Sequence, residues 1–286
     1  MAVKLGIQLF SLRNKMAEDP VATLKKIFEI GYRYLEPANS RANEDPVLGY
    51  GVSAGQLSEI LQRYGGRICS AHLGPLTMET IPEIARQHHA LGNKNIVEAI
   101  MFYQDYDHLT RRCEEYNKIG RYLVGHDMNP LLYHNHYHEY QVLGGKEILY
   151  TIMENTDPDY LQFEVDTGWV KRAGRDPVTE MKVAGSRLRT IHIKDFSHTP
   201  PNLLIGKEDP ISWETFGANY QPGDVMTPED FVEVGTGMME IQAILDAANE
   251  LGVEYAILEQ DDTARDIFDS IGDSLQNLKK YQGLEV

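Results

Sequence analysis

The sequence is poor in cysteine, and this argues against two ways of holding a fold together. Only Cys69 and Cys113 occur among the 286 residues, and neither belongs to a CxxC pair. The spacing of a disulfide framework and that of a thiolate metal site are therefore both missing. We expect the two cysteines to be buried or half-buried residues of an ordinary core.

The chain also lacks a long apolar run. None approaches the about 18 residues that a membrane helix requires. The opening residues, MAVKLGIQLF, do not have the pattern of a signal peptide. We therefore expect a cytoplasmic protein that has no contact with a membrane.

Basic charge is scarce as well. Lys and Arg number 27 against 43 Asp and Glu, which gives a formal net charge of −16. This charge repels a polyphosphate backbone, and the basic residues are scattered rather than gathered, so no nucleic-acid partner is expected. The acidic runs GKEDP and EQDDTARD are typical of a solvated surface.

What the chain does have is an alternation of short apolar runs with longer segments of helical period. The predicted strands are residues 3–10, 32–37, 67–73, 95–100, 130–136, 160–166, 188–196 and 254–260. Predicted helices between them include 19–31, 53–66 and 238–252, each of which ends in glycine. Together they predict a (β/α)8 barrel, a TIM barrel, as a single domain over residues 1–286. An open doubly wound sheet is the alternative, but no GxGxxG follows the first strand.

Residues 197–235 do not fit the alternation. They are rich in Pro and Gly and lie between the seventh strand and its helix. A connection of this length in a barrel is usually functional. We expect it to be a lid over the carboxyl ends of the strands or a contact in a homo-oligomer.

Polar residues that bind metals or move protons follow four consecutive strands. The fifth strand ends in YHNHYHE, the sixth in FEVDTGW, the seventh in IHIKDF and the eighth in AILEQDD. Because the active site of a barrel lies at these ends, His134 or His136, Asp166, His192 and Glu259 are expected at one rim. Mixed imidazole and carboxylate ligands suit one divalent ion, namely Mn²⁺, Mg²⁺, Co²⁺ or Zn²⁺.

Several stretches resemble the sugar phosphate isomerase/epimerase group of xylose isomerase-like TIM barrels, which is related to endonuclease IV. They are YHNHYHEY (133–140), EVDTGWVKRAGRDPV (164–178), IHIKDF (191–196) and the segment 234–261. The resemblance implies one divalent ion held by a Glu, an Asp, a His and a second Glu. The last three correspond to Asp166, His192 and Glu259, whereas His134 stands where the first Glu is expected.

This departure defines the expectations for the histidine-rich stretch. His134 is predicted to be a metal ligand or a replacement base, and His136 to face the same rim and contact substrate. His138 and Glu139 are expected in the following loop, with a solvated His138 as the alternative. Glu139 would support a ligand histidine by folding back to accept an N–H.

The remaining candidates would serve proton abstraction. Glu259 or His134 would remove a proton α to a carbonyl, and Lys194 with the metal would hold the enediolate charge. Lys194 could instead pair with Asp195. Trp169 could pack on a sugar ring or cap the rim. The resemblance further implies that His72 and Glu36 line the pocket, and Phe10 is expected to form a hydrophobic wall.

These expectations define a metal-dependent sugar isomerase or epimerase that acts on a keto sugar or a sugar derivative. Loss of a β-substituent from the same enolate would instead give a dehydratase or lyase of a keto sugar, an inosose or a 3-keto-glycoside. An endonuclease IV-like phosphodiesterase and a non-catalytic sugar-binding barrel are less favoured. No basic pocket for a phosphate is evident, so a non-phosphorylated substrate is expected.

Overall fold

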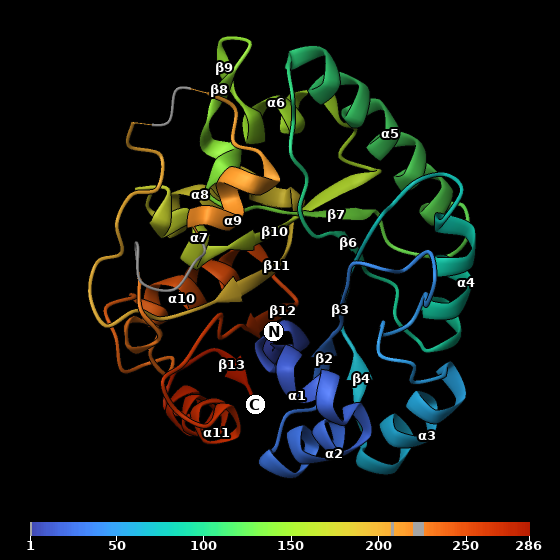
Figure 1. Ribbon diagram of the computed structural model, residues 1–286, viewed down its shortest axis with the longest axis vertical. Helices are drawn as coiled ribbons and strands as arrows, with labels where there is room; N and C mark the ends of the chain where they lie inside the picture. Colours follow the sequence, from blue (N-terminus) through green and yellow to red (C-terminus); the bar gives the residue numbers. More distant parts are fainter. Residues whose placement is uncertain (1, 207–208, 220–225) are drawn as a thin grey trace.

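A closed ring of parallel strands forms the centre of the protein. The computed structural model describes residues 2–206, 209–219 and 226–286 (Figure 1). Two ring strands are interrupted: one consists of β2 (Tyr34–Glu36) and β3 (Ala38–Asn39), the other of β4 (Arg67–Ile68) and β5 (Ala71–Leu73). The others are β1 (Val3–Gln8), β6 (Ile96–Glu98), β7 (Leu131–His134), β10 (Leu161–Asp166), β11 (Leu188–Ile193) and β12 (Tyr255–Leu258).

Each strand pairs with the next in chain order, and β12 pairs with β1. The described strands therefore close a (β/α)8 barrel, as predicted. A short additional strand, β13 (Leu284–Glu285), pairs with the beginning of β1.

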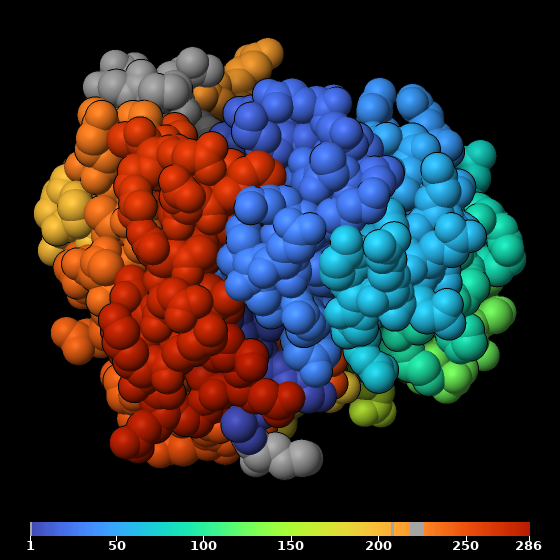
Figure 2. Space-filling model, turned by 90° about the horizontal axis from the view of Figure 1, so that it is seen from below, coloured from blue at the N-terminus to red at the C-terminus, as the bar shows by residue number. Residues whose placement is uncertain are grey.

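Helices surround the ring. They are α1 (Arg13–Glu18), α2 (Pro20–Ile30), α3 (Ala54–Tyr64), α4 (Ile81–Ala90), α5 (Tyr106–Val124), α6 (Ile148–Asn155), α7 (Thr167–Arg172), α8 (Pro177–Ala184), α9 (Trp213–Asn219), α10 (Ile241–Leu251) and α11 (Ile267–Leu278). Figure 2 shows α11 beside the N-terminal segment, where it contacts α2. Within the described ranges, no helix combines the length and the apolar character needed to cross a membrane.

Local sequence explains where the predicted helices begin and end. The Asp19 side chain accepts the N–H of Ala22 at the start of α2, and Gly31 ends that helix with a φ of 133°. Ser53 and Gln56 form a capping box before α3. The predicted helices at 19–31, 53–66 and 238–252 are therefore confirmed, with ends one to three residues inside the expected ones.

The strands are shorter than the apolar runs that predicted them. After β1 the chain turns into a 3-10 helix, Leu9–Leu12, so the strand expected over 3–10 ends at Gln8. Pro37 interrupts the second strand because it has no N–H to donate. The third is interrupted between Ile68 and Ala71, where the Ser70 hydroxyl turns inward to the Glu36 carboxylate.

The barrel interior changes from apolar to polar along the strands. Alternate residues of a strand face the same side, so Tyr255, Ile257 and then Glu259 form one row, and Tyr34 and then Glu36 another. Tyr34, Tyr255 and Ile257 pack together at the amino end of the interior. The carboxylates therefore converge at the carboxyl end, where the site is built. Cys69 and Cys113 are both buried, as predicted.

The segment 197–235 is partly described, since 207–208 and 220–225 lie outside the described residues. Its described part contains α9, a helix that the Pro- and Gly-rich composition did not predict, and a 3-10 turn, Pro228–Asp230. The ring of Phe216 in α9 packs against Tyr137 and Trp169, with ring centroids 5.4 and 5.7 Å apart. The helix thus lies over the carboxyl ends of β7 and β10, and a role as a lid or as an oligomer contact stays a prediction.

A histidine far from the barrel mouth links stability to pH. His88 in α4 is fully buried, with Nε2 donating to the carbonyl of Pro46 and Nδ1 accepting from the Asn93 amide, both at 3.0 Å. Burial lowers the pKa of His88 from 6.5 to about 4. As the pH falls below 6.5, the unfolded chain therefore takes up a proton that the folded chain excludes.

We expect this histidine to remove about 2 kcal/mol of unfolding free energy between pH 7.5 and pH 5. Urea unfolding at both pH values measures the loss. His88→Gln keeps a donor and an acceptor but does not titrate, so its loss should be smaller by that amount. Equal pH dependence in the two proteins would contradict the assignment.

Candidate metal and active site

Four side chains converge where β7, β10, β11 and β12 end. His134, Asp166, His192 and Glu259 each offer one ligand atom, and these atoms all lie within 4.8 Å of one another. All four residues are buried. The strand register produces this meeting, because Asp166 pairs with His192 and Glu164 pairs with His134. The structure therefore brings together the complete set of ligands predicted from the sequence.

Asp166 is oriented by the helix that follows it. Its Oδ1 accepts the N–H of Trp169 at 2.8 Å and so caps α7. With Oδ1 engaged, Oδ2 points into the site, 3.4 Å from His134 Nε2 and 3.6 Å from His192 Nδ1. Burial raises the pKa of Asp166, but the charge of Lys194 and the contact with His134 outweigh it and hold the pKa well below its usual value.

His134 presents an unprotonated nitrogen to the site. Its Nδ1 donates to the carbonyl oxygen of Ala99 at 3.2 Å, which leaves Nε2 as the acceptor. Burial lowers the pKa of His134 to about 4, so the ring is neutral near pH 7. Among the described residues, neither His134 Nε2 nor Asp166 Oδ2 has a partner in hydrogen-bonding geometry, although Asp166 Oδ2 has an ion-pair contact with Lys194 at 3.1 Å. A divalent ion held by imidazole and carboxylate would satisfy both atoms, so the residues fit the predicted metal.

His192 has a carboxylate on each side of its ring. Nδ1 lies 2.9 Å from Glu259 Oε2, and Nε2 lies 2.6 Å from Glu36 Oε2. Burial opposes the charged ring, but Glu164, Glu36 and Glu259 raise the pKa of His192 well above its usual value. The Nε2 contact fixes the ring so that Nδ1 faces the ligand set.

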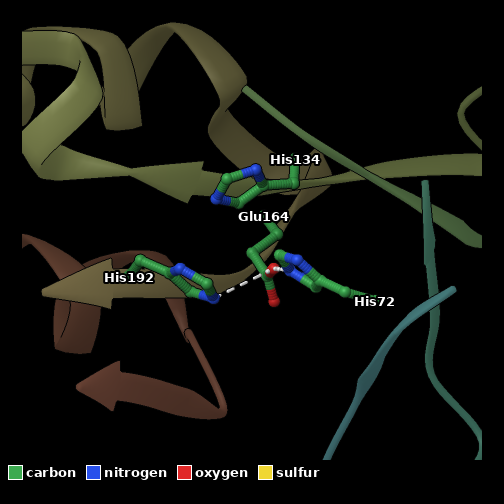
Figure 3. Close-up of side chains that lie close together, drawn as sticks. All are labelled: His72, His134, Glu164 and His192. Carbon is green, nitrogen blue, oxygen red and sulfur yellow. Dashed lines mark hydrogen bonds and ion pairs between the residues drawn. The ribbon is translucent and has the colours of Figure 1, made fainter. Parts of the chain in front are cut away.

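A second polar cluster lies on the Nε2 side of His192. Figure 3 shows His72 and His192 on either side of the Glu164 carboxylate, with His134 above it. Glu164 Oε1 lies 2.5 Å from His72 Nε2 and 3.2 Å from His192 Nε2. Burial raises the pKa of Glu36 and the neighbouring Glu164 raises it further, whereas His72 and His192 oppose this rise. His72 and Glu36 therefore lie beside the predicted ligand set, and their contact with substrate stays a prediction.

Lys194 is buried among three carboxylates. Its Nζ lies 3.1 Å from Asp166 Oδ2, 2.8 Å from Glu259 Oε2, and 2.8 and 2.9 Å from the two oxygens of Asp261. The alternative pairing with Asp195 is wrong. Adjacent residues after a strand face opposite sides, and the Asp195 carboxylate instead accepts backbone N–H groups from the 235–239 turn.

The rest of the histidine-rich stretch folds back over the strand end. Glu139 is fully buried and accepts the N–H of His136 at 2.8 Å and the hydroxyl of Tyr133 at 3.0 Å. His138 is also buried, with Nε2 donating to the carbonyl of Met101 at 2.9 Å. A solvated His138 is therefore wrong. Glu139 folds back, but it accepts the backbone N–H of His136 and not, as was expected, an N–H of a ligand histidine. His136 is half-buried between the rings of His134 and Trp169.

Trp169 and Phe10 have different surroundings. The indole of Trp169 lies beneath Lys194, with Nζ 5.0 Å from the ring centroid, so Trp169 borders the site. Phe10 is half-buried, and its ring packs under the Arg13 guanidinium at 4.4 Å. A substrate contact for either ring stays a prediction.

Asp261 was missed in the sequence. It lies within EQDDTARD, a run interpreted as solvated surface, yet only 3% of Asp261 is exposed. The usable signal was its spacing, since Asp261 follows Glu259 by two residues as Lys194 follows His192. Phe216 was also missed, because its segment has no strand or helix period that would place it at the barrel mouth.

Comparison with known sequences finds only partial similarity. No protein-family model matches the chain. Inosose dehydratases of Mesomycoplasma hyopneumoniae strains 7448 and 232 are each 36% identical over 93 residues, which is 32% of this chain and 29% of each relative. The match thus spans less than a third of the length of these relatives.

Comparison with solved structures covers the whole chain. A sugar phosphate isomerase/epimerase from Parabacteroides distasonis ATCC 8503 superposes with a TM-score of 0.76 at 21% identity, over 99% of this chain and 100% of the other. The probable 3-DHS dehydratase AsbF from Bacillus anthracis gives 0.71 at 12% identity, over 98% and 100%. IolI, solved with a zinc atom, gives 0.65 at 15% identity, over 98% and 99%.

The chain has the xylose isomerase-like TIM barrel fold. The resemblance predicted from the strand ends is thereby confirmed at the level of structure. Other barrels of this fold include isomerase/epimerase and dehydratase proteins, so the fold itself does not separate these reactions.

The Glu139 carboxylate gives a direct test of how this xylose isomerase-like barrel supports its strand-five histidines. Glu139→Ala leaves the buried His136 N–H and Tyr133 hydroxyl without their acceptor, and should lower the unfolding free energy by about 3 kcal/mol. Glu139→Gln keeps an acceptor oxygen and should lose less than half of that. Urea unfolding measures the unfolding free energy of both variants. Equal losses in Glu139→Ala and Glu139→Gln would show that the two hydrogen bonds contribute little to that free energy.

Proposed function

We propose that this protein is a divalent-metal-dependent enzyme that removes the proton α to the carbonyl of a keto sugar or sugar derivative. One observation supports the proposal most directly. His134 Nε2, Asp166 Oδ2, His192 Nδ1 and Glu259 Oε2 converge at the carboxyl ends of four barrel strands, with the Lys194 ammonium beside them. Isomerisation or epimerisation of the sugar is the reaction that we propose first.

The same four residues would hold the ion. When bound, a divalent ion supplies a Lewis acid that polarises carbonyl and hydroxyl oxygens of the substrate. Asp166 and Glu259 contribute two negative charges, and His134 is a neutral ligand where the resembled group has a third carboxylate. The site would therefore neutralise the ion with one negative charge fewer, which makes the ion a stronger electrophile.

The protein's own residues supply the proton transfer. Among the described residues, the contacts of Glu259 run through Oε2, which leaves Oε1 to accept the substrate proton. Lys194 places its positive charge where the oxygen of the enolate would become negative. The rings of Trp169 and Phe216, which pack on each other, would exclude water from the position of the enolate oxygen beside Lys194.

Dehydration is the second candidate, because the site contains a further acid-base pair. His72 and Glu164, 2.5 Å apart, lie on the far side of His192 and could protonate a leaving hydroxyl. The partial similarity to inosose dehydratases and the fold shared with AsbF support this alternative. Loss of water from the enolate would then replace reprotonation at carbon.

Metal analysis of the purified protein is the first test. We expect about one equivalent of Mn, Co, Mg or Zn in the wild type, and affinity at least about tenfold weaker in His134→Ala. His126→Ala, at an exposed histidine, is the matched control and should keep the metal. Absence of metal from the wild type, even after reconstitution, would contradict the proposed function.

Deuterium uptake then tests the chemistry and separates the two reactions. The metal-loaded protein is incubated in D2O with inosose, ketohexoses and 3-keto-glucosides, and the products are followed by NMR. We expect deuterium at the carbon α to the carbonyl, and a rate at least about 100-fold lower in Glu259→Gln. An epimer or isomer with deuterium at this carbon indicates the first reaction. An unsaturated ketone that has lost the α hydrogen to the solvent, together with the β hydroxyl as water, indicates the second. An epimer or isomer without deuterium, or an unsaturated ketone that keeps the α hydrogen, would contradict proton abstraction.

A further inference from the structure

Lys194 contacts the same oxygen atoms that would bind the metal. Its Nζ lies 3.1 Å from Asp166 Oδ2 and 2.8 Å from Glu259 Oε2, both members of the ligand set. An ammonium and a divalent ion cannot both occupy the space between these two oxygens. Something must therefore keep the lysine to one side if the ion is to bind there.

The Asp261 carboxylate is placed to hold the lysine to one side. Both of its carboxylate oxygens accept from Lys194 Nζ, at 2.8 and 2.9 Å, whereas Asp166 and Glu259 each contact Nζ through one oxygen. Asp261 is 3% exposed, so its contact with Lys194 is little screened by water. It does not belong to any of the ligand groups found in the described residues.

The stem of Lys194 is confined as well. A Cβ added at Gly168 would lie 2.9 Å from Lys194 Cδ, 3.1 Å from Cβ and 3.2 Å from Cγ, so any larger residue there would displace the stem. The Trp169 ring borders the ammonium at 5.0 Å. These contacts limit where Nζ can move. In its present position, Nζ is within hydrogen-bond distance of both carboxylate oxygens of Asp261.

We propose that Asp261 is a positioning residue, which holds the Lys194 ammonium at the edge of the ligand set. When a divalent ion enters, the ammonium keeps its contacts with Asp261, releases the oxygens of Asp166 and Glu259 to the ion, and stays beside the position of the substrate oxygen. Three carboxylates and one ammonium leave two negative charges, which a divalent ion balances. The inference rests on the proposed function, because it assigns Asp261 a role toward the proposed ion.

A double-mutant cycle on metal affinity tests this role. Calorimetry measures the Kd for Mn²⁺ and for Zn²⁺ in the metal-free wild type, Asp261→Asn, Lys194→Met and the double variant. With Lys194 present, Asp261→Asn should raise the Kd about tenfold, because the ammonium then loses its charged contact with Asp261 and competes more strongly for the ligand oxygens. With Lys194→Met, the same change should raise it less than about threefold.

Two comparisons separate positioning from simple loss of charge. Asp262→Asn makes the same charge change one residue away, without a contact to Lys194 among the described residues, and should leave the Kd within about twofold. An equal effect of Asp261→Asn with and without the lysine would overturn the positioning role alone. No binding of either ion to the wild type would overturn the proposed function and this role together.

A structure of the wild-type protein with Mn²⁺ provides a second measurement that needs no variant. Lys194 Nζ is expected to remain hydrogen-bonded to Asp261 and to have left Asp166 Oδ2 and Glu259 Oε2. An ammonium that still bridges those two oxygens beside the ion would overturn the inference.

Discussion

The imidazole of His192 joins two buried groups of charges, and the site depends on it. On its Nδ1 side lie Glu259 and Asp166, and on its Nε2 side lie Glu36 and Glu164. Buried charges are tolerated only when each has a partner, because the desolvation cost of an unpaired ion exceeds what folding can offset. The ring therefore couples the candidate ligand set to the His72 and Glu164 pair.

His134 stands where the resemblance implies a glutamate, and the groups around it suit a neutral imidazole. The Ala99 carbonyl fixes the proton on Nδ1, so the nitrogen that faces Asp166 is the one with a lone pair. A glutamate here would add a negative charge to a site that already contains Asp166, Glu259 and Asp261. A neutral imidazole thus fits a site in which an additional carboxylate lies beside the lysine rather than among the predicted ligands.

Much of this arrangement could be predicted from the sequence, because two simple rules determine it. Parallel strands of a barrel end at one rim, and alternate residues share a face, so His134, Asp166, His192 and Glu259 had to meet. The pairing of His72 with Glu164 depends on the register between distant strands, which composition does not reveal. The burial of Asp261 was missed for a different reason. An acidic run is typical of a solvated surface, and the composition of this run does not indicate that a buried lysine pairs with one of its residues. The helix α9 was missed because its segment is rich in helix-breaking residues.

The segment above the site is attached to the barrel near both of its ends. Near its start, the Leu203 N–H donates to the carbonyl of Arg172. At its end and just beyond it, the two oxygens of Asp195 accept the N–H groups of Gly235, Gly237 and Met239. Neither attachment uses a ligand residue. A replacement of the chain between these points could therefore change which molecules enter the barrel while leaving its reactive groups as they are, so substrate choice and chemistry can diverge independently in proteins built this way.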